Sequence, residues 1–177
     1  IPSTAAWVNY VRCHDDIGWA ITEADAASVG WSSLSHRDFL LQFYAGQFPG
    51  SFAKGAVFQY NPETGDGRTS GSAASLCGIE RALADHDDVH LELACARLEL
   101  LYAVTYAYGG IPLLYMGDEL GLCNDTTYLG DAAKADDNRW LHRPRMDWAL
   151  AERRHQPGTL QARLFAMFAA LGAARAG

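Results

Sequence analysis

Two short apolar runs stand out along the chain, and each one ends in acidic residues. The first spans residues 7–11, is rich in aromatic and β-branched side chains, and leads into Asp15 and Asp16. The second spans residues 111–116 and leads into Asp118. Runs of this length and composition are typical of buried strands in a parallel sheet. Because α/β enzymes carry their chemistry at the carboxyl ends of such strands, the pattern predicts an active site around Asp15.

Helical periodicity follows each predicted strand. Ser35, with Asp38 three residues later, resembles a helix start, and this helix is expected to end near Pro49. A longer helix is predicted over residues 88–108, and a final one begins at Thr159. The order strand, helix, strand, helix favours a parallel sheet. The apolar positions of the second helix include Val89, Leu93, Leu100, Leu101 and Val104.

Long irregular segments separate these elements. Residues 22–34 predict a loop with a short helix, whereas residues 50–78 are dense in Gly, Ser and Thr and predict a long ordered loop. Residues 123–148 are polar, and Pro144 prevents a continuous helix there. Loops of this length in a compact domain are usually functional or disordered, and Phe52, Phe58 and Tyr60, which need burial, favour a functional loop at residues 50–78.

Two strands are too few for an independent parallel sheet, because both edges and much of both faces would stay open. The first six residues lack the features of a signal peptide, and the chain does not begin with Met. We therefore expect a segment of a larger (β/α) enzyme.

Composition narrows the function classes. The chain has 177 residues, of which 49% are hydrophobic, and a net charge of −7 without a basic stripe. This balance argues against nucleic-acid binding and favours small neutral or polar substrates. Four cysteines without C-x-x-C spacing predict free thiols and a cytoplasmic location. No apolar run approaches the roughly 18 to 20 residues of a membrane span.

The His14, Asp15, Asp16 trio is the strongest local motif. A carboxylate beside an imidazole can stabilise positive charge or bind sugar hydroxyls. The alternative is structural, since a His-Asp pair at a strand end can simply cap the next turn.

Two further motifs have structural explanations. His86 and His90 superficially match H-E-x-x-H, but Asp stands where the Glu would be, so a capped helix start is expected instead of a zinc site. Gly65, Gly67 and Gly71 do not form a phosphate-binding loop and are expected to let a loop close over a pocket. No metal or cofactor is predicted.

Most arginines are expected to be solvated surface charges. Arg68 and Arg139 are better candidates for a pocket, because each lies in a polar loop after a predicted strand.

Four segments, in order along the chain, resemble motifs of one enzyme family. NYVRCHDDIGW and GGIPLLYMGDELG resemble the seventh- and eighth-strand segments of the α-amylase superfamily, glycoside hydrolase family 13. HDDIGW, together with FQYNPETGDGR and DDNRWLHRPR, is similar more specifically to the amylosucrases and sucrose hydrolases of that family. The resemblance extends from Trp7 to the last helix.

The resemblance implies an α/β fold that is a partial (β/α)8 TIM barrel, with strands 7 and 8, their helices and a long loop after strand 7. Residues 1–177 would be the C-terminal portion of the catalytic domain, and residues 16–85 the loop-rich insertion. The rest of the barrel and the family's C-terminal β-sandwich are absent from the chain.

The resemblance also implies roles for individual residues. Asp15 matches the family's transition-state-stabilising carboxylate, and His14 matches a histidine that binds glucosyl hydroxyls. Asp16 and Arg68 match positions that contact the fructosyl unit or the acceptor. Arg139 resembles an arginine that closes the glucosyl pocket through an ion pair with a partner outside this chain. Further pocket or acceptor-site residues would be Arg37, Gln59 and Asn61.

The implied activity is sucrose cleavage through a covalent glucosyl-enzyme intermediate, with water or an α-glucan as acceptor. The family's nucleophilic Asp and general-acid Glu precede this region, so the 177 residues alone are expected to be inactive and to require the rest of the barrel. The sequence does not distinguish a transferase, which uses an α-glucan as acceptor, from a hydrolase, which uses water. The alternatives are a non-catalytic carbohydrate-binding or structural module derived from the barrel, and an α-glucosidase, which HDDIGW disfavours.

Overall fold

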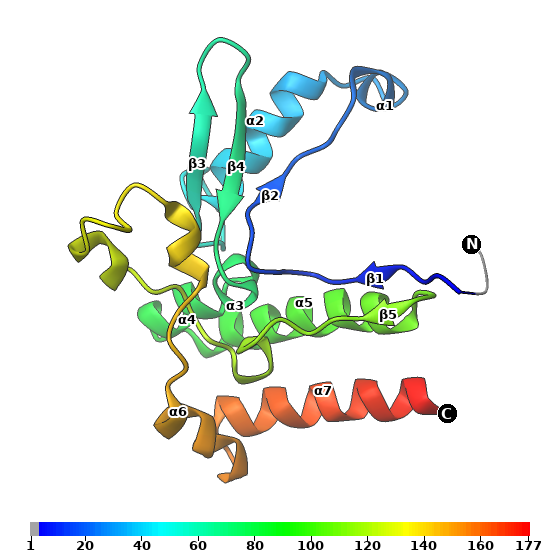
Figure 1. Cartoon of the computed structure of the whole chain (residues 1–177), viewed down its shortest axis with the longest axis vertical. Coiled ribbons are helices and arrows are strands. Elements are labelled where there is room, and N and C mark those ends of the chain that lie inside the picture. Colours follow the sequence, from blue (N-terminus) through cyan, green and yellow to red (C-terminus); the bar gives the residue numbers. More distant parts are fainter. Residues whose placement is uncertain (1–3) are drawn as a thin grey trace.

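The computed structural model describes residues 4–177, which form a mixed α/β structure (Figure 1). Within this described range there are two small sheets and no closed barrel. One sheet belongs to a lobe that also carries the first two helices, and the other lies against a layer of long helices (Figure 1).

The two strands predicted from the apolar runs are neighbours, as expected for a parallel sheet. β1 (Val8–Asn9) pairs in parallel with β5 (Ile111–Pro112), with Val8 opposite Ile111. Both strands are shorter than predicted from residues 7–11 and 111–116, and they are not the buried strands that the sequence predicts, because Val8 and Ile111 are exposed in this chain. The pairing ends with a bond from the Leu113 amide to the Asn9 carbonyl (2.8 Å). Neither strand has a second neighbour among residues 4–177, so nothing extends the ladder.

The predicted long loop at residues 50–78 is wrong, because most of it is regular structure. β3 (Ala56–Asn61) and β4 (Asp66–Ser70) form an antiparallel hairpin, and β2 (Ile17–Gly18) pairs with the other side of β4. The turn of the hairpin includes Gly65 at φ +63°, a conformation that glycine adopts without strain. Polar residues fill this hairpin, which is why its composition predicted a loop.

Two helices complete this lobe. α1 (Glu23–Ala27) is the short helix expected in residues 22–34, and Thr22 and Asp25 form its capping box. α2 (Ser33–Tyr44) begins two residues before the predicted start, because Ser32 caps it by accepting a bond from the Ser35 amide. It also ends well before Pro49. α2 packs over one face of the hairpin, where Leu41 approaches Gly67.

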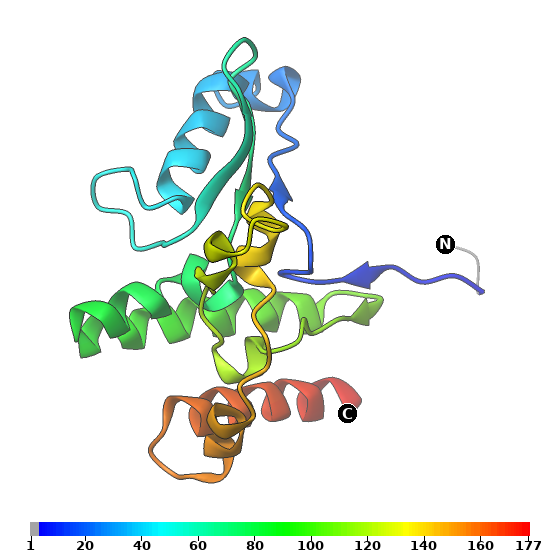
Figure 2. The ribbon, with the colours of Figure 1, turned by 60° about the vertical axis from the view of Figure 1, so that its left-hand side comes forward.

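The second part of the molecule is a layer of helices (Figure 2). α5 (Asp88–Ala107) and α7 (Leu160–Ala176) match the two helices predicted over residues 88–108 and from Thr159, and they lie side by side. Two shorter helices, α3 (Ala73–Cys77) and α4 (Ile79–Asp85), precede α5. The core between them comprises Ala73, Ala74, Cys77, Ile79, Ala94, Cys95, Leu98, Tyr102, Leu164 and Phe168.

α5 presents apolar side chains on two sides, but only one side is buried. Leu98 and Tyr102 are fully buried against α3 and α7. The apolar positions expected from the sequence lie on the other side and are exposed in this chain: Val89, Leu93, Leu100, Leu101 and Val104. Together with Trp7, Val8 and Ile111 of the parallel strand pair, which are also exposed, they leave an apolar surface uncovered.

The start of α5 confirms the capped-helix interpretation of the His86 and His90 motif. The Asp87 carboxylate accepts a bond from the His90 amide (2.9 Å) and contacts the His90 ring Nδ1 (2.7 Å). His86 lies between α4 and α5 in the left-handed region, at φ +53°. The two histidines therefore do not share a helix face.

The region after β5 is irregular, as predicted. It contains the 3₁₀ helices η1 (Asp118–Leu120), η2 (Thr127–Gly130), η3 (Asn138–His142) and η4 (Arg153–His155), and the short α6 (Trp148–Glu152). η3 returns to the hairpin lobe, where the Asn138 side-chain amide donates to the Val57 carbonyl of β3 (2.9 Å). This return brings residues 138–143 next to the carboxyl end of β1.

Candidate functional site

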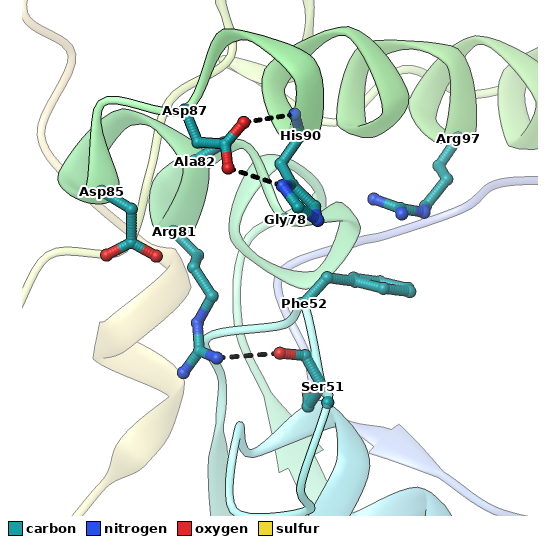
Figure 3. A pocket seen from close by; sticks show the side chains of 10 residues that line it. Ser51, Phe52, Gly78, Arg81, Ala82, Asp85, Asp87, His90 and Arg97 are labelled. Carbon is teal, nitrogen blue, oxygen red and sulfur yellow. Dashed lines mark hydrogen bonds and ion pairs between the residues drawn. The ribbon is translucent and has the colours of Figure 1, made fainter.

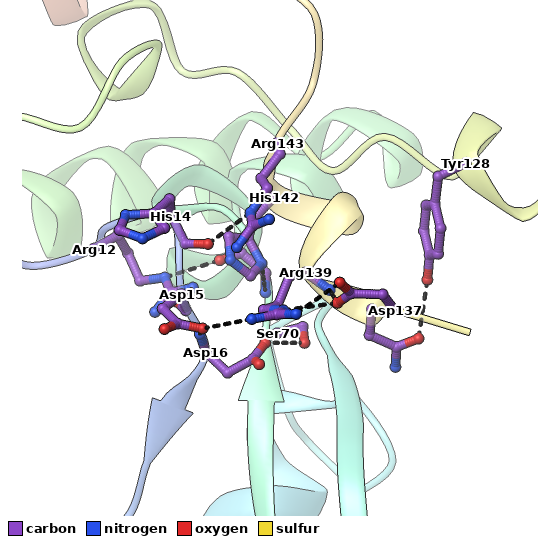
Figure 4. A network of polar contacts seen from close by, with 12 residues as sticks. Arg12, His14, Asp15, Asp16, Ser70, Tyr128, Asp137, Arg139, His142 and Arg143 are labelled. Carbon is purple, nitrogen blue, oxygen red and sulfur yellow. Dashed lines mark hydrogen bonds and ion pairs between the residues drawn. The ribbon is translucent and has the colours of Figure 1, made fainter. Parts of the chain in front are cut away.

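Three segments that are distant in sequence meet at the carboxyl end of β1 (Figure 4). They are the turn that carries His14, Asp15 and Asp16, the end of β4 at Ser70, and η3 with Arg139. The site predicted around Asp15 is therefore a cluster of polar side chains in the folded chain. His14 is exposed, and the Asp15 side chain is 49% exposed, so both are accessible to a ligand.

Arg139 connects two carboxylates within this cluster. Its guanidinium binds Asp137 through two hydrogen bonds, from Nε (2.8 Å) and Nη2 (2.9 Å). Its Nη1 lies 3.8 Å from Oδ1 of Asp15. The bidentate pair raises the pKa of Arg139 and lowers the pKa of Asp137. The family resemblance predicted a partner outside this chain, whereas Arg139 is paired here with Asp137.

Asp16 faces the end of the hairpin. The Ser70 hydroxyl donates to Oδ1 of Asp16 at 2.5 Å, and Ser70 is fully buried. Burial raises the pKa of Asp16, although the bond from Ser70 acts in the opposite direction. The second carboxylate oxygen, Oδ2, is buried and has no hydrogen-bond partner among residues 4–177. Asp16 thus keeps one oxygen uncommitted.

The main chain of the turn is held by two arginines that the sequence did not single out for this purpose. The Arg143 Nε donates to the His14 carbonyl (2.7 Å). The Arg12 Nη2 donates to the Asp15 carbonyl (2.8 Å). The sequence does not reveal these two contacts, because each arginine binds a backbone carbonyl oxygen, which every residue carries.

His142 is a second site residue that sequence reasoning missed. It is 1% exposed, and its Nδ1 accepts a bond from the Gly71 amide (3.3 Å). Burial lowers the pKa of His142 to about 4, and the nearby Arg12 acts in the same direction. The ring is therefore neutral near pH 7, with the proton on Nε2.

The predicted acceptor residues gather in a neighbouring hollow of about 390 Å³. Gln59, Asn61 and Arg68 line it together with residues 18–20. Side chains alternate along a strand, so Arg68 points to the same face of β4 as Ser70, which binds Asp16. Arg68 of the hollow and Ser70 of the Asp15 cluster therefore lie on the same face of β4.

Arg37 lies in α2, the helix that packs on the hairpin. It donates to the Ile21 carbonyl (2.9 Å), and its Nε lies 3.8 Å from Asp66, which lines the same hollow. The structure therefore brings Arg37 near the Gln59 hollow through Asp66 and not to the Asp15 cluster.

A separate hollow of about 320 Å³ lies between α4, α5 and residues 50–52 (Figure 3). The Arg81 Nη1 donates to the Ser51 carbonyl (2.8 Å), and the Arg97 guanidinium stacks over the Phe52 ring at 3.8 Å. None of the site residues predicted from the sequence lines this hollow.

The acidic end of β5 differs from that of β1. Asp118 is 3% exposed and accepts a hydrogen bond from the Tyr102 hydroxyl of α5. Burial raises the pKa of Asp118 to about 7. Glu119 accepts a bond from the Gly117 amide (2.9 Å). These contacts are structural, so only the β1 end offers an accessible acidic cluster.

Other classes of site receive no support from residues 4–177. No group of three or more His, Cys, Asp or Glu side chains in this range could bind a metal ion. The four cysteines, Cys13, Cys77, Cys95 and Cys123, are free. No helix of this part of the chain is long and apolar enough to cross a bilayer. No known protein-family model matches the chain.

Proposed function

We propose that this chain is the last two β/α units of a (β/α)8 barrel in a retaining, sucrose-cleaving glucosyl enzyme. The observation that carries the proposal is the contact between Asp15 and Arg139 at the carboxyl end of a parallel strand. An accessible carboxylate, flanked by an exposed histidine and a paired arginine, suits a sugar bearing developing positive charge.

The fold supports the barrel assignment. β1 and β5 are parallel neighbours, and α5 lies between them in sequence, as in a β/α/β unit. Closing a barrel requires further strands against both β1 and β5, and the rest of the barrel would cover the exposed Trp7, Val8 and Ile111. The exposed apolar side of α5 would likewise be covered by neighbouring parts of the barrel.

The chemistry assigned to this chain is assistance to a reaction at the sucrose anomeric carbon. A nucleophilic carboxylate outside the chain attacks this carbon, and the bond to the fructosyl oxygen breaks as a general acid protonates that oxygen. The glucosyl unit then passes to water or to an α-glucan hydroxyl. Asp15 stabilises the positive charge that develops on the sugar ring, and His14 binds glucosyl hydroxyls.

The fructosyl and acceptor side is assigned to Asp16 and the neighbouring hollow. Asp16 is assigned to this side because it adjoins Asp15 and bonds Ser70 on the face of β4 that Arg68 shares. Its unpaired Oδ2 is shielded from solvent among residues 4–177, so a bond from a sugar hydroxyl to this oxygen requires the turn to move. The hollow contributes an amide pair and a guanidinium from Gln59, Asn61 and Arg68. Arg37 acts at its margin through Asp66.

The test is sucrose cleavage by the full-length protein that carries this chain. We expect fructose release, with either free glucose or an α-glucan as the second product, which separates hydrolase from transferase. The isolated 177 residues should release neither sugar. Absence of fructose release from the full-length protein would contradict the proposal, and release from the isolated chain would contradict the assignment of the nucleophile to another segment.

A non-catalytic carbohydrate-binding module is the second candidate. It is favoured by the position of Asp15 and Asp16 side by side on one wall of the site, an arrangement that can bind hydroxyls without cleaving a bond. Calorimetric binding of sucrose or maltooligosaccharides by the full-length protein, without any product, would support this candidate over the enzyme.

A further inference from the structure

Arg12 is an unusual residue for the interior of this protein. It is 4% exposed, and no carboxylate lies within 4 Å of its guanidinium nitrogens in residues 4–177. A buried cation without a direct ion pair is costly, and burial lowers the pKa of Arg12, although the charges of Asp118 and Asp16 act in the opposite direction from a greater distance. An apolar side chain of similar volume would avoid this cost.

The guanidinium instead joins two backbone carbonyl groups. Its Nε donates to Gly71 (2.9 Å), directly after β4, and its Nη2 donates to Asp15 (2.8 Å). The Gly71 amide donates to His142 on its other side. A planar guanidinium offers several donors in a fixed geometry, so it can set the position of Asp15 relative to the hairpin.

The neighbouring peptide is fixed by the same type of contact. The Arg143 Nε donates to the His14 carbonyl (2.7 Å), so both residues assigned to the glucosyl pocket have their carbonyl oxygens bound by arginines (Figure 4). These carbonyl oxygens are thereby occupied. Within the described range, the Asp15 carboxylate makes its protein contacts, with the Asp16 amide (3.2 Å) and Arg139 (3.8 Å), through Oδ1, so its Oδ2 is left for a ligand.

We infer that Arg12 is a positioning residue that fixes the Asp15 carboxylate for transition-state stabilisation. This inference rests on the proposed function. Electrostatic stabilisation depends on groups that are already oriented before the reaction, and a displacement of about 1 Å can cost about 100-fold in rate. Arg12 acts through Asp15 and does not touch the sugar.

The first test is Arg12→Lys in the full-length protein. The charge is kept but the fixed fork is lost, so we expect kcat for fructose release to fall about 100-fold, with KM changed by less than about threefold. The control is Arg81→Lys, because Arg81 makes the same kind of bond, to the Ser51 carbonyl at 2.8 Å, away from this site. It should retain wild-type kcat.

A double-mutant cycle separates positioning from a general structural role. In the Asp15→Asn background, Arg12→Lys should reduce the residual kcat by less than about twofold, because the group that it positions no longer acts. An equal reduction in both backgrounds would overturn the inference. Arg143→Lys provides a partly exposed alternative should Arg12→Lys fail to fold, and it should lower kcat about tenfold by the same route.

The inference and the proposed function fail in different ways. A wild-type protein that does not cleave sucrose overturns both. A wild-type protein that cleaves sucrose, with Arg12→Lys and Arg143→Lys at wild-type kcat, overturns the inference alone. A fall in kcat for Arg12→Lys that vanishes in the Asp15→Asn background, with an unchanged Arg81→Lys control, supports it.

Discussion

The two strand ends of this protein share a sequence pattern and differ in what surrounds them. Asp15 follows β1, has a 49% exposed side chain and lies 3.8 Å from Arg139. Asp118 follows β5, is 3% exposed and is bound by Tyr102 from α5. A carboxylate at a strand end is thus available for chemistry only where no helix covers it. The two strand ends differ in exposure because Tyr102 of α5 packs on Asp118, whereas Asp15 is contacted by Arg139 of η3.

The largest effect should separate these two carboxylates. In the full-length protein, Asp15→Asn should lower kcat for sucrose cleavage by about 100- to 1000-fold, because the amide cannot stabilise positive charge as a carboxylate does. Steady-state kinetics of fructose release measure this change.

The matched control is the same substitution at the other strand end. Asp118→Asn should leave kcat within about threefold of wild type, since an amide resembles the protonated carboxyl that burial favours there. If both variants lost activity equally, the distinction between the two strand ends would be wrong.

The sequence predicts which acidic residues lie together at the end of β1 better than it predicts the residues that hold them. His14, Asp15 and Asp16 are predicted from their position after a strand. Arg68 and Arg139 are predicted from polar segments expected to be loops, which is wrong for both, because Arg68 lies in β4 and Arg139 in η3. Arg12 could not be found in this way, because its partners are backbone oxygens of Gly71 and Asp15, which no side-chain pattern reveals. Ser70 and His142 were missed for a related reason, since their roles depend on tertiary contacts alone.

The second prediction concerns the pH dependence of stability at Asp118. Its pKa is raised from 3.8 to about 7 in the folded state, so the folded protein binds this proton more tightly than the unfolded chain. The resulting stabilisation is complete below pH 4 and is lost as the pH rises through about 7. Asp118→Asn removes this dependence, so the variant should match wild type in melting temperature below pH 4 and exceed it by a growing margin up to pH 8.

The titration of His142 does not affect the comparison of Asp118→Asn with wild type. Its pKa is lowered to about 4, so its contribution is lost as the pH falls below about 6.5, which is the opposite sign. It is present in both proteins and cancels in their difference. A difference in melting temperature that stays constant from pH 5 to pH 8 would contradict the assignment for Asp118.

A smaller effect on stability is expected when the Tyr102 hydroxyl, which donates to Asp118, is removed. Tyr102→Phe leaves a buried carboxyl without its donor and should destabilise the protein by about 1–3 kcal/mol, measured by thermal or denaturant unfolding. Tyr60→Phe is the control, because Tyr60 is 51% exposed and should change stability by less than about 0.5 kcal/mol. Equal stability of the two variants would show that Tyr102 does not hold Asp118.

The fold itself was predicted unevenly, for physical reasons. The long helices follow from helical periodicity and the parallel pairing of β1 with β5 from the order strand, helix, strand, and both are present. The hairpin of β3 and β4 was missed, because its residues are mostly polar and glycine-rich and one face of it is left to the site. Its stability comes from α2 packing on the other face, where Leu41 meets Gly67. Such tertiary support leaves no local signal.

The smallest predicted effect distinguishes the two acids within the β1 turn itself. Ser70→Ala removes the hydroxyl that binds Asp16 at 2.5 Å and should raise KM for sucrose about three- to tenfold, a change of about 1 kcal/mol, with kcat nearly unchanged. The expected split follows from the roles assigned to the two acids, because Asp16 binds the fructosyl side while Asp15 acts on the transition state. Ser28→Ala is the control: Ser28 donates to the Asp25 carbonyl at the end of α1 (2.6 Å), does not line the hollow, and should leave KM unchanged. A fall in kcat for Ser70→Ala, instead of a rise in KM, would assign Asp16 to the chemical step and remove the division of labour between the two carboxylates.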